Sequence, residues 1–149
     1  MKRRLFFIAG LVTFVLLLQQ CKTADNLPPG DPDNGGLAIP EGFEAVVFAD
    51  STGPARHIAV NDNGDVYVKL RFSRGDKGNV ALRDVNGDGR ADSIVRFGDY
   101  PNDGSMATEM RIHNGYLWFS SEKVLYKQKL TPGQLIPDGK PEAVLTDDH

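Results

Sequence analysis

Short runs of alternating apolar and polar residues fill the chain from residue 39 onward. The pattern predicts strands at 43–49, 56–60, 65–70, 79–83, 93–97, 109–113, 116–120, 124–129 and 142–145. These runs are rich in Val, Ile, Tyr and Phe and are bounded by Gly, Pro, Asn and Asp, as β-strands typically are. Because no stretch in this part has the period of an amphipathic helix, we expect an all-β fold.

The two halves of this region repeat one order of elements. Each half has a strand, a turn containing Asn and Gly, a strand with a central aromatic residue, a short loop, a strand, a longer loop and a last strand. Four-stranded units of about 50 residues are typical of β-propeller blades. We therefore predict blade 1 at 39–98 and blade 2, truncated at its C-terminal end, at 99–149. Since propellers have about four to eight blades, these would be the first two; the alternative is a complete, small β-sandwich.

The N-terminal segment has the features of an export signal. Three basic residues, Lys2, Arg3 and Arg4, precede the apolar run 5–18, which is short for a membrane-spanning helix. The following LLLQQC resembles the cleavage site of bacterial lipoproteins, although Gln20 stands where such sites carry a small residue. We predict a signal helix at 1–20, and lipidation of Cys21 that anchors the chain to a membrane. The alternatives are an ordinary secretory signal and an uncleaved anchor.

Residues 21–38 are polar and rich in Pro and Gly, which predicts a disordered, flexible tether between the anchor and the blades. The predicted location is therefore the bacterial cell envelope, as a periplasmic or outer-membrane lipoprotein. The chain has 149 residues, a formal net charge of −3 and a single cysteine. That charge gives no indication of a nucleic-acid partner, and one cysteine permits no internal disulfide.

The stretch DVNGDGRAD at 84–92 is the best candidate for a metal site. Oxygen ligands would come from Asp84, Asn86, Asp88 and Asp92 and from the main-chain carbonyl of Arg90. This spacing matches the first part of an EF-hand loop, which binds calcium through oxygens. The position of the essential bidentate Glu is Val95, and a strand rather than a helix follows, which excludes a true EF-hand. A calcium loop between two strands and a merely solvated turn both remain open.

Three segments together resemble one protein family. They are GFEAVVFADSTGPARHIAVNDNGDVYVKL, NVALRDVNGDGRADSIVRFGD and MRIHNGYLWFSSEKVLYKQKLTPGQLIP. They resemble the N-terminal blades of sorbosone dehydrogenase-like proteins, which belong with the soluble glucose dehydrogenases that use pyrroloquinoline quinone (PQQ). The resemblance implies a six-bladed propeller that binds PQQ and calcium at its axis. It also implies oxidation of a sugar or polyol by hydride transfer to the quinone, with no indication of the electron acceptor.

The resemblance also implies a catalytic pair. In the soluble glucose dehydrogenases the base is a histidine preceded by an aspartate, and Asp148 and His149 match that pair. Most cofactor-clamping residues of the family come from later blades. The 149 residues alone are therefore not expected to oxidise sugar.

Three residues at the starts of the predicted inner strands are candidates for cofactor binding. Arg56 and His57 open the inner strand of blade 1, and Arg111 lies in that of blade 2. Side chains at the start of such a strand can reach the propeller axis. The alternatives are that His57 packs against a neighbouring blade and that Arg111 forms an ordinary ion pair with Glu109.

Two other functions compete with the enzyme. The DVNGDGRAD loop followed by SIVRFG also resembles the calcium-loop repeats of integrin-like propellers, which are binding modules without catalytic activity. Those loops recur in every blade, whereas the equivalent segment 131–140 here has no ladder of acidic residues, which favours the dehydrogenase. A surface lipoprotein without a ligand is the third interpretation.

Overall fold

The computed structural model describes residues 27–74, 77–101, 104, 107 and 109–147. The first four strands are β1 (Ala55–Val60), β2 (Val66–Arg74), β3 (Lys77–Arg83) and β4 (Ser93–Asp99). The next four are β5 (Met110–His113), β6 (Tyr116–Ser120), β7 (Val124–Lys129) and β8 (Asp138–Thr146). A single 3-10 turn, Asn34–Gly36, is the one helical segment in these residues. The prediction of an all-β fold is confirmed.

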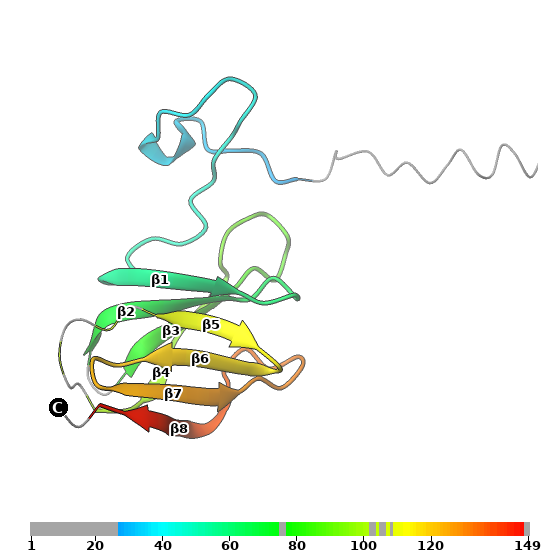
Figure 1. Ribbon diagram of the computed structural model, residues 1–149. Coiled ribbons are helices and arrows are strands. Elements are labelled where there is room, and N and C mark those ends of the chain that lie inside the picture. The colour runs from blue at the N-terminus through cyan, green and yellow to red at the C-terminus, as the bar shows by residue number, and fades with distance from the viewer. Residues whose placement is uncertain (1–26, 75–76, 102–103, 105–106, 108, 148–149) are drawn as a thin grey trace, which may run out of the picture.

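Each group of four strands forms one antiparallel sheet, with the strands in sequence order. We call β1 to β4 the first sheet and β5 to β8 the second sheet. The two sheets lie face to face (Figure 1), with β1 against β5 and β4 against β8. Eight of the nine predicted strands are thus present, and β8 is longer than the predicted 142–145.

Turn chemistry explains why neighbouring strands pair in this register. Asn114 and Gly115 join β5 to β6 with φ angles of 50° and 75°, and His113 pairs with Tyr116 on either side. Positive φ at both central residues is the geometry whose twist matches that of the flanking strands. Gly64 has a φ of 89° in the equivalent turn between β1 and β2.

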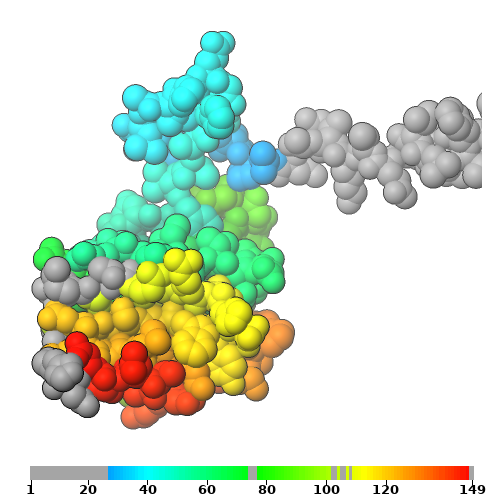
Figure 2. Space-filling view, viewed as in Figure 1, coloured from blue at the N-terminus to red at the C-terminus, as the bar shows by residue number. Residues whose placement is uncertain are grey.

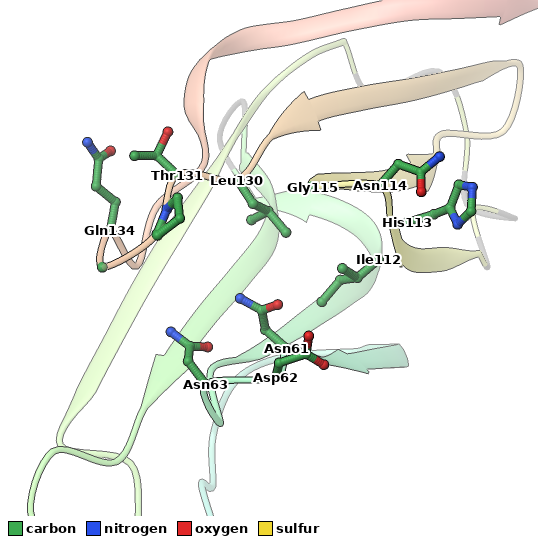
Figure 3. Close-up of a pocket in the computed structure, with 12 residues that line it drawn as sticks. Asn61, Asp62, Asn63, Ile112, His113, Asn114, Gly115, Leu130, Thr131 and Gln134 are labelled. Atoms are coloured by element: carbon green, nitrogen blue, oxygen red, sulfur yellow. The ribbon is translucent and has the colours of Figure 1, made fainter.

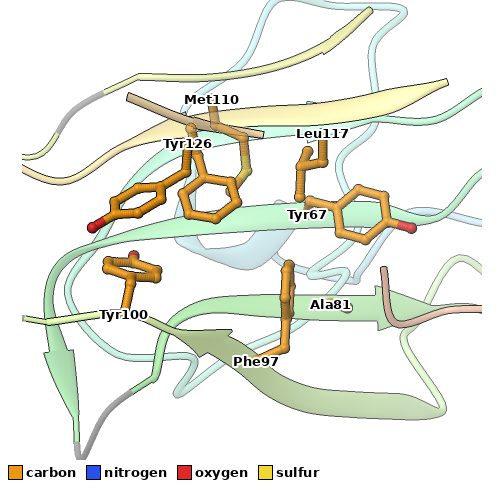
Figure 4. Packing of buried hydrophobic residues seen from close by; sticks show 8 residues of the cluster. Tyr67, Ala81, Phe97, Tyr100, Met110, Leu117 and Tyr126 are labelled. Atoms are coloured by element: carbon orange, nitrogen blue, oxygen red, sulfur yellow. The ribbon is translucent and has the colours of Figure 1, made fainter. Parts of the chain in front are cut away.

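The main hydrophobic core lies between the two sheets (Figure 4). Its buried members are Tyr67, Ala81, Phe97, Tyr100, Met110, Leu117, Phe119 and Tyr126. Both sheets contribute, because inward-facing positions alternate along β2 and β6. The rings of Tyr100, Phe119 and Tyr126 lie 5.1 to 5.7 Å apart, within the range in which aromatic side chains attract one another.

The prediction of a strand at 43–49 is wrong. This segment has no regular secondary structure, and its end packs on the face of the first sheet that points away from the second sheet. There Phe48 and Ala49 contact the cluster of Val68, Leu70, Val80 and Leu82. The apolar residues of the segment therefore do not mark a strand, since Phe48 and Ala49 cover a sheet without joining it and Phe43 is exposed.

Part of the predicted tether makes hydrogen bonds with residues 45 and 47. The Asp31 N–H donates to the Ala45 carbonyl at 2.8 Å, and the Asp31 carboxylate accepts from the Val47 N–H at 2.7 Å. The Asn34 side chain accepts from the Ala45 N–H at 3.1 Å. These bonds use the main chain that a strand at 43–49 would have needed. Most of residues 27–47 lie outside the two packed sheets (Figure 2), whereas Phe48 and Ala49 contact the first sheet.

The predicted signal and its cysteine cannot be placed. Residues 1–26, which include Cys21, lie outside the described residues, as do Asp148 and His149. Within the part of the chain that the structure describes, no helix has the length and apolarity needed to cross a membrane.

Candidate functional site

The candidate cofactor residues meet where β1 lies beside β5. His57 Nε2 is 3.9 Å from Glu109 Oε1, and Arg111 Nε donates to the same oxygen at 2.9 Å. We call Arg56, His57, Glu109 and Arg111 the inner-strand cluster. Glu109 is thus shared between a residue of the first sheet and a residue of the second sheet.

Strand geometry positions this cluster. β1 and β5 are the first strands of their sheets, and they run in the same direction (Figure 1). A β-bulge between Ala55 and His57 leaves Arg56 without a register partner on β2, and its side chain is exposed. Bulges re-aim side chains and are common near functional sites. The structure therefore brings His57 and Arg111, predicted separately, to one place.

The cluster is open to solvent. The side chains of His57, Glu109 and Arg111 are 34%, 48% and 74% exposed. Arg56 makes no hydrogen bond or ion pair with any described residue, and Arg111 makes only its bond to Glu109. Two guanidinium groups with free donors can bind carboxylates in a bidentate manner. Arg111 does form the ion pair with Glu109 that was the alternative to cofactor binding. That pair uses Nε and leaves the terminal nitrogens of Arg111 available.

The loop 84–92 folds around its own aspartate. Asp84 accepts the Gly87 N–H at 2.7 Å through Oδ1 and the Gly89 N–H at 2.8 Å through Oδ2. Asp92 accepts the Val85 N–H at 2.7 Å. Burial would raise the pKa of Asp84, but main-chain N–H donors around its carboxylate outweigh that effect and lower the pKa.

Further side chains of the loop also accept its own N–H groups, and the calcium site stays a prediction. The Asn86 side chain accepts the Asp88 N–H and the Asp88 side chain accepts the Arg90 N–H, each at 2.9 Å. The Arg90 guanidinium donates to the Val47 carbonyl and pairs with Asp31. Calcium needs several oxygens directed at one point. Among the described residues, no group of three or more His, Cys, Asp or Glu could hold a metal ion. The loop is closed by its own N–H groups.

Sequence reasoning missed a buried ion pair. Asp65 is 1% exposed, and Arg83 donates to its two carboxylate oxygens at 2.6 and 2.7 Å. The hydrogen bond from Arg83 lowers the pKa of Asp65, against the opposing effect of burial. Asp65 follows a turn and Arg83 ends a strand, and both positions are ordinary places for exposed charges. The sequence carries no signal for their pairing.

A buried lysine was also missed. Lys69 is 1% exposed and lies on the face of β2 that points toward the second sheet. Its Nζ donates to the Leu70 carbonyl and to the Tyr100 hydroxyl, each at 2.8 Å. Lys69 lies two residues after Tyr67 and therefore on the same face of the strand, and that spacing is the one signal that could have indicated its inward position.

No family model matches this chain, and neither a curated protein nor a solved structure matches it. The class of protein therefore rests on the fold itself. It is an all-β protein of two consecutive four-stranded antiparallel sheets.

Proposed function

We propose that the chain supplies the first two blades of an exported β-propeller quinoprotein that oxidises a sugar or polyol. The observation that carries the proposal is the inner-strand cluster, in which β1 and β5 place His57 beside Glu109 and Arg111. In a propeller the first strands of successive blades surround the central channel, where ligands bind. Residues on two such strands would therefore face one ligand.

The outward faces of both sheets support a ring of further blades. Ile58 and Val60 on β1 are each 59% exposed, and Ile94 on β4 is 52% exposed. On the second sheet, Leu145 of β8 is 66% exposed. Apolar side chains in such positions are stabilised when a neighbouring sheet covers them. Two blades flanked by others would bury both faces.

The cationic residues of the cluster fit an anionic cofactor. PQQ carries three carboxylates, and the exposed guanidinium groups of Arg56 and Arg111 would bind two of them. When bound, the quinone supplies the hydride acceptor for oxidation of an alcohol. Glu109 orients Arg111 through its Nε, and His57 offers an imidazole nitrogen that can hold a proton. The catalytic pair implied by the resemblance, Asp148 and His149, stays part of the proposal.

A binding experiment tests the cofactor. The full chain is titrated with PQQ, and quenching of the single tryptophan, Trp118, is followed because Trp118 lies opposite Arg111 in the register of β5 and β6. Arg111→Ala should weaken binding about tenfold, as expected when one charge-assisted contact is lost. Lys129→Ala is the matched control, since Lys129 is an exposed cation at the end of β7.

The activity needs a separate assay on the full-length protein. PQQ-dependent bleaching of a redox dye in the presence of aldoses or polyols would support the dehydrogenase. Saturable PQQ binding that Arg111→Ala leaves unchanged would count against the cluster, and no binding at all would count against the quinoprotein. The electron acceptor in the cell is not part of the proposal.

The location is the last part of the proposal. A lipid on Cys21 would hold the protein at the membrane of the cell envelope through burial of its methylene groups. Metabolic labelling with a fatty acid should mark the wild-type chain and leave Cys21→Ser unlabelled. Equal labelling of the two would refute the anchor without affecting the proposed chemistry.

A further inference from the structure

Three turns form a cleft at the end of the sheets that is opposite to the inner-strand cluster. The cleft has a volume of about 460 Å³ and is lined by residues 61–63, 112–115 and 130–134 (Figure 3). These segments are the turn between β1 and β2, the end of β5 with its turn to β6, and the loop between β7 and β8. We call this space the turn cleft.

Hydrogen bonds fix the walls of the turn cleft to both sheets. The Leu130 N–H donates to the Gly115 carbonyl at 2.8 Å, which joins two of the walls. The Tyr67 hydroxyl donates to the Leu135 carbonyl at 3.1 Å, and Arg83 donates to the Gly133 carbonyl at 3.3 Å. The loop between β7 and β8 is therefore held by residues of the first sheet. A preformed site loses less conformational entropy when a ligand binds.

Most polar side chains of the turn cleft have unused hydrogen-bonding capacity. Within the described residues, no hydrogen bond or ion pair involves the side chains of Asn61, Asp62, His113, Asn114 and Gln134. Thr131, by contrast, donates to Asp138. Carboxamides and imidazole each offer both a donor and an acceptor. Ile112 and Leu130 extend into the space between the turns and give it an apolar floor (Figure 3).

The chemistry of this lining selects a class of ligand. No Lys or Arg lines the cleft, so it has no cation to bind a phosphate or another anion. Asp62 is its single carboxylate, which is too few ligands for a metal ion. Sugar hydroxyls need paired donors and acceptors, and the C–H groups of a sugar ring pack on apolar side chains. We propose that the turn cleft binds a neutral sugar, either free or at the end of a glycan.

This second sugar site is independent of the proposed oxidation. No residue of the inner-strand cluster lines it, although its wall residue Ile112 directly follows Arg111 in β5. A sugar held there would be bound without being oxidised. The site would therefore attach the protein to a glycan or retain sugar near it.

The test is an NMR titration of the ¹⁵N-labelled full chain. The probes are glucose, galactose and mannose as free sugars, and maltose and cellobiose as models of glycan ends. We expect saturable shifts gathered in the amides of 61–64, 112–115 and 130–134. A response to the disaccharides alone would identify a glycan end as the ligand, and an equal response to monosaccharides would identify free sugar.

Variants separate specific binding from weak association. Asp62→Ala and Gln134→Ala each remove one exposed polar side chain of the cleft and should raise the dissociation constant about fivefold, the effect of one hydrogen bond. Asp50→Ala is the control, because Asp50 is also an exposed aspartate but lies outside the cleft. The inference is overturned if no probe gives saturable shifts, if the shifts lie elsewhere, or if both cleft variants bind as the control does.

Discussion

The buried ion pair of Asp65 and Arg83 offers a quantitative test of what stabilises the first sheet. Asp65→Asn keeps the shape of the side chain and removes its charge. Arg83 Nε and Nη2 now lie 2.6 and 2.7 Å from the two Asp65 oxygens, and the Asn63 side chain donates to Asp65 at 2.9 Å. In the variant an NH₂ group would replace one of the two oxygens that accept from Arg83. The Arg83 guanidinium would then lose its bidentate partner.

The expected cost follows from burial. Breaking a fully buried pair costs about 3–5 kcal/mol, because one charge is left without its partner in a poorly solvated place. Asp65 is 1% exposed, whereas the Arg83 side chain is 28% exposed and water can partly solvate it. We therefore expect Asp65→Asn to lower the free energy of unfolding by about 2–3 kcal/mol.

Urea unfolding followed by Trp118 fluorescence measures this cost. The matched control is Glu109→Gln, which removes the exposed pair with Arg111 and should cost less than about 1 kcal/mol. The pKa of Asp65 is lowered in the folded state, so the charge contributes stability above its unfolded pKa of about 3.9. The difference between wild type and Asp65→Asn should therefore shrink as the pH falls below about 4.

Two results would refute this reasoning. One is an equal cost for Asp65→Asn and Glu109→Gln, which would mean that burial does not strengthen the first pair. The other is a difference from wild type that persists unchanged well below pH 4, because the carboxylate charge would then not be its source. Arg83 also holds the Gly133 wall of the turn cleft, so Asp65→Asn should weaken sugar binding there as well.

Two further predictions concern buried or enclosed side chains. Tyr67→Phe removes the bond to the Leu135 carbonyl and should cost about 1 kcal/mol in urea unfolding. Burial raises the pKa of Tyr67 to about 12, so wild type should lose stability between pH 10 and 12 while the Phe variant loses less; parallel curves would contradict this. Asp84→Asn should lower the melting temperature, because it weakens the acceptor for several N–H groups, and a change in calcium concentration should leave that of wild type unchanged. A rise in the melting temperature of wild type with calcium would instead support a calcium site in the loop 84–92.

The alternating pattern was sufficient to predict eight strands and the all-β fold. It could do so because each strand of a packed antiparallel sheet has one face toward a core and short turns between neighbours. The failure at 43–49 shows the limit of that signal. Apolar residues at alternate positions show that a segment covers something, but a strand also needs a partner for its main chain. Here Asp31 and Asn34 take those main-chain groups.

The candidate sites differ in how far the sequence could predict them. His57 and Arg111 were identifiable because both lie near the starts of repeated first strands, and repetition predicts that such positions lie side by side. The turn cleft was not identifiable, because its three walls are far apart in the sequence and each looks like an ordinary turn. The sequence could not decide the role of the acidic loop for a physical reason. Asp84 at the start of a glycine-rich loop can bind a cation or accept the loop's own N–H groups, and the residue types are the same in both cases.

The two ends of the sheets have different electrostatic character, and this difference connects the proposals. In the inner-strand cluster His57 and Arg111 contact the Glu109 carboxylate, and the exposed Arg56 precedes His57 in β1, which suits a negatively charged ligand. The turn cleft has carboxamides, an imidazole and one aspartate without a cation, which suits a neutral ligand. Because the two sites share no residue, PQQ binding and sugar binding in the cleft can fail separately. Arg111→Ala should weaken PQQ binding alone, and Gln134→Ala should weaken sugar binding alone.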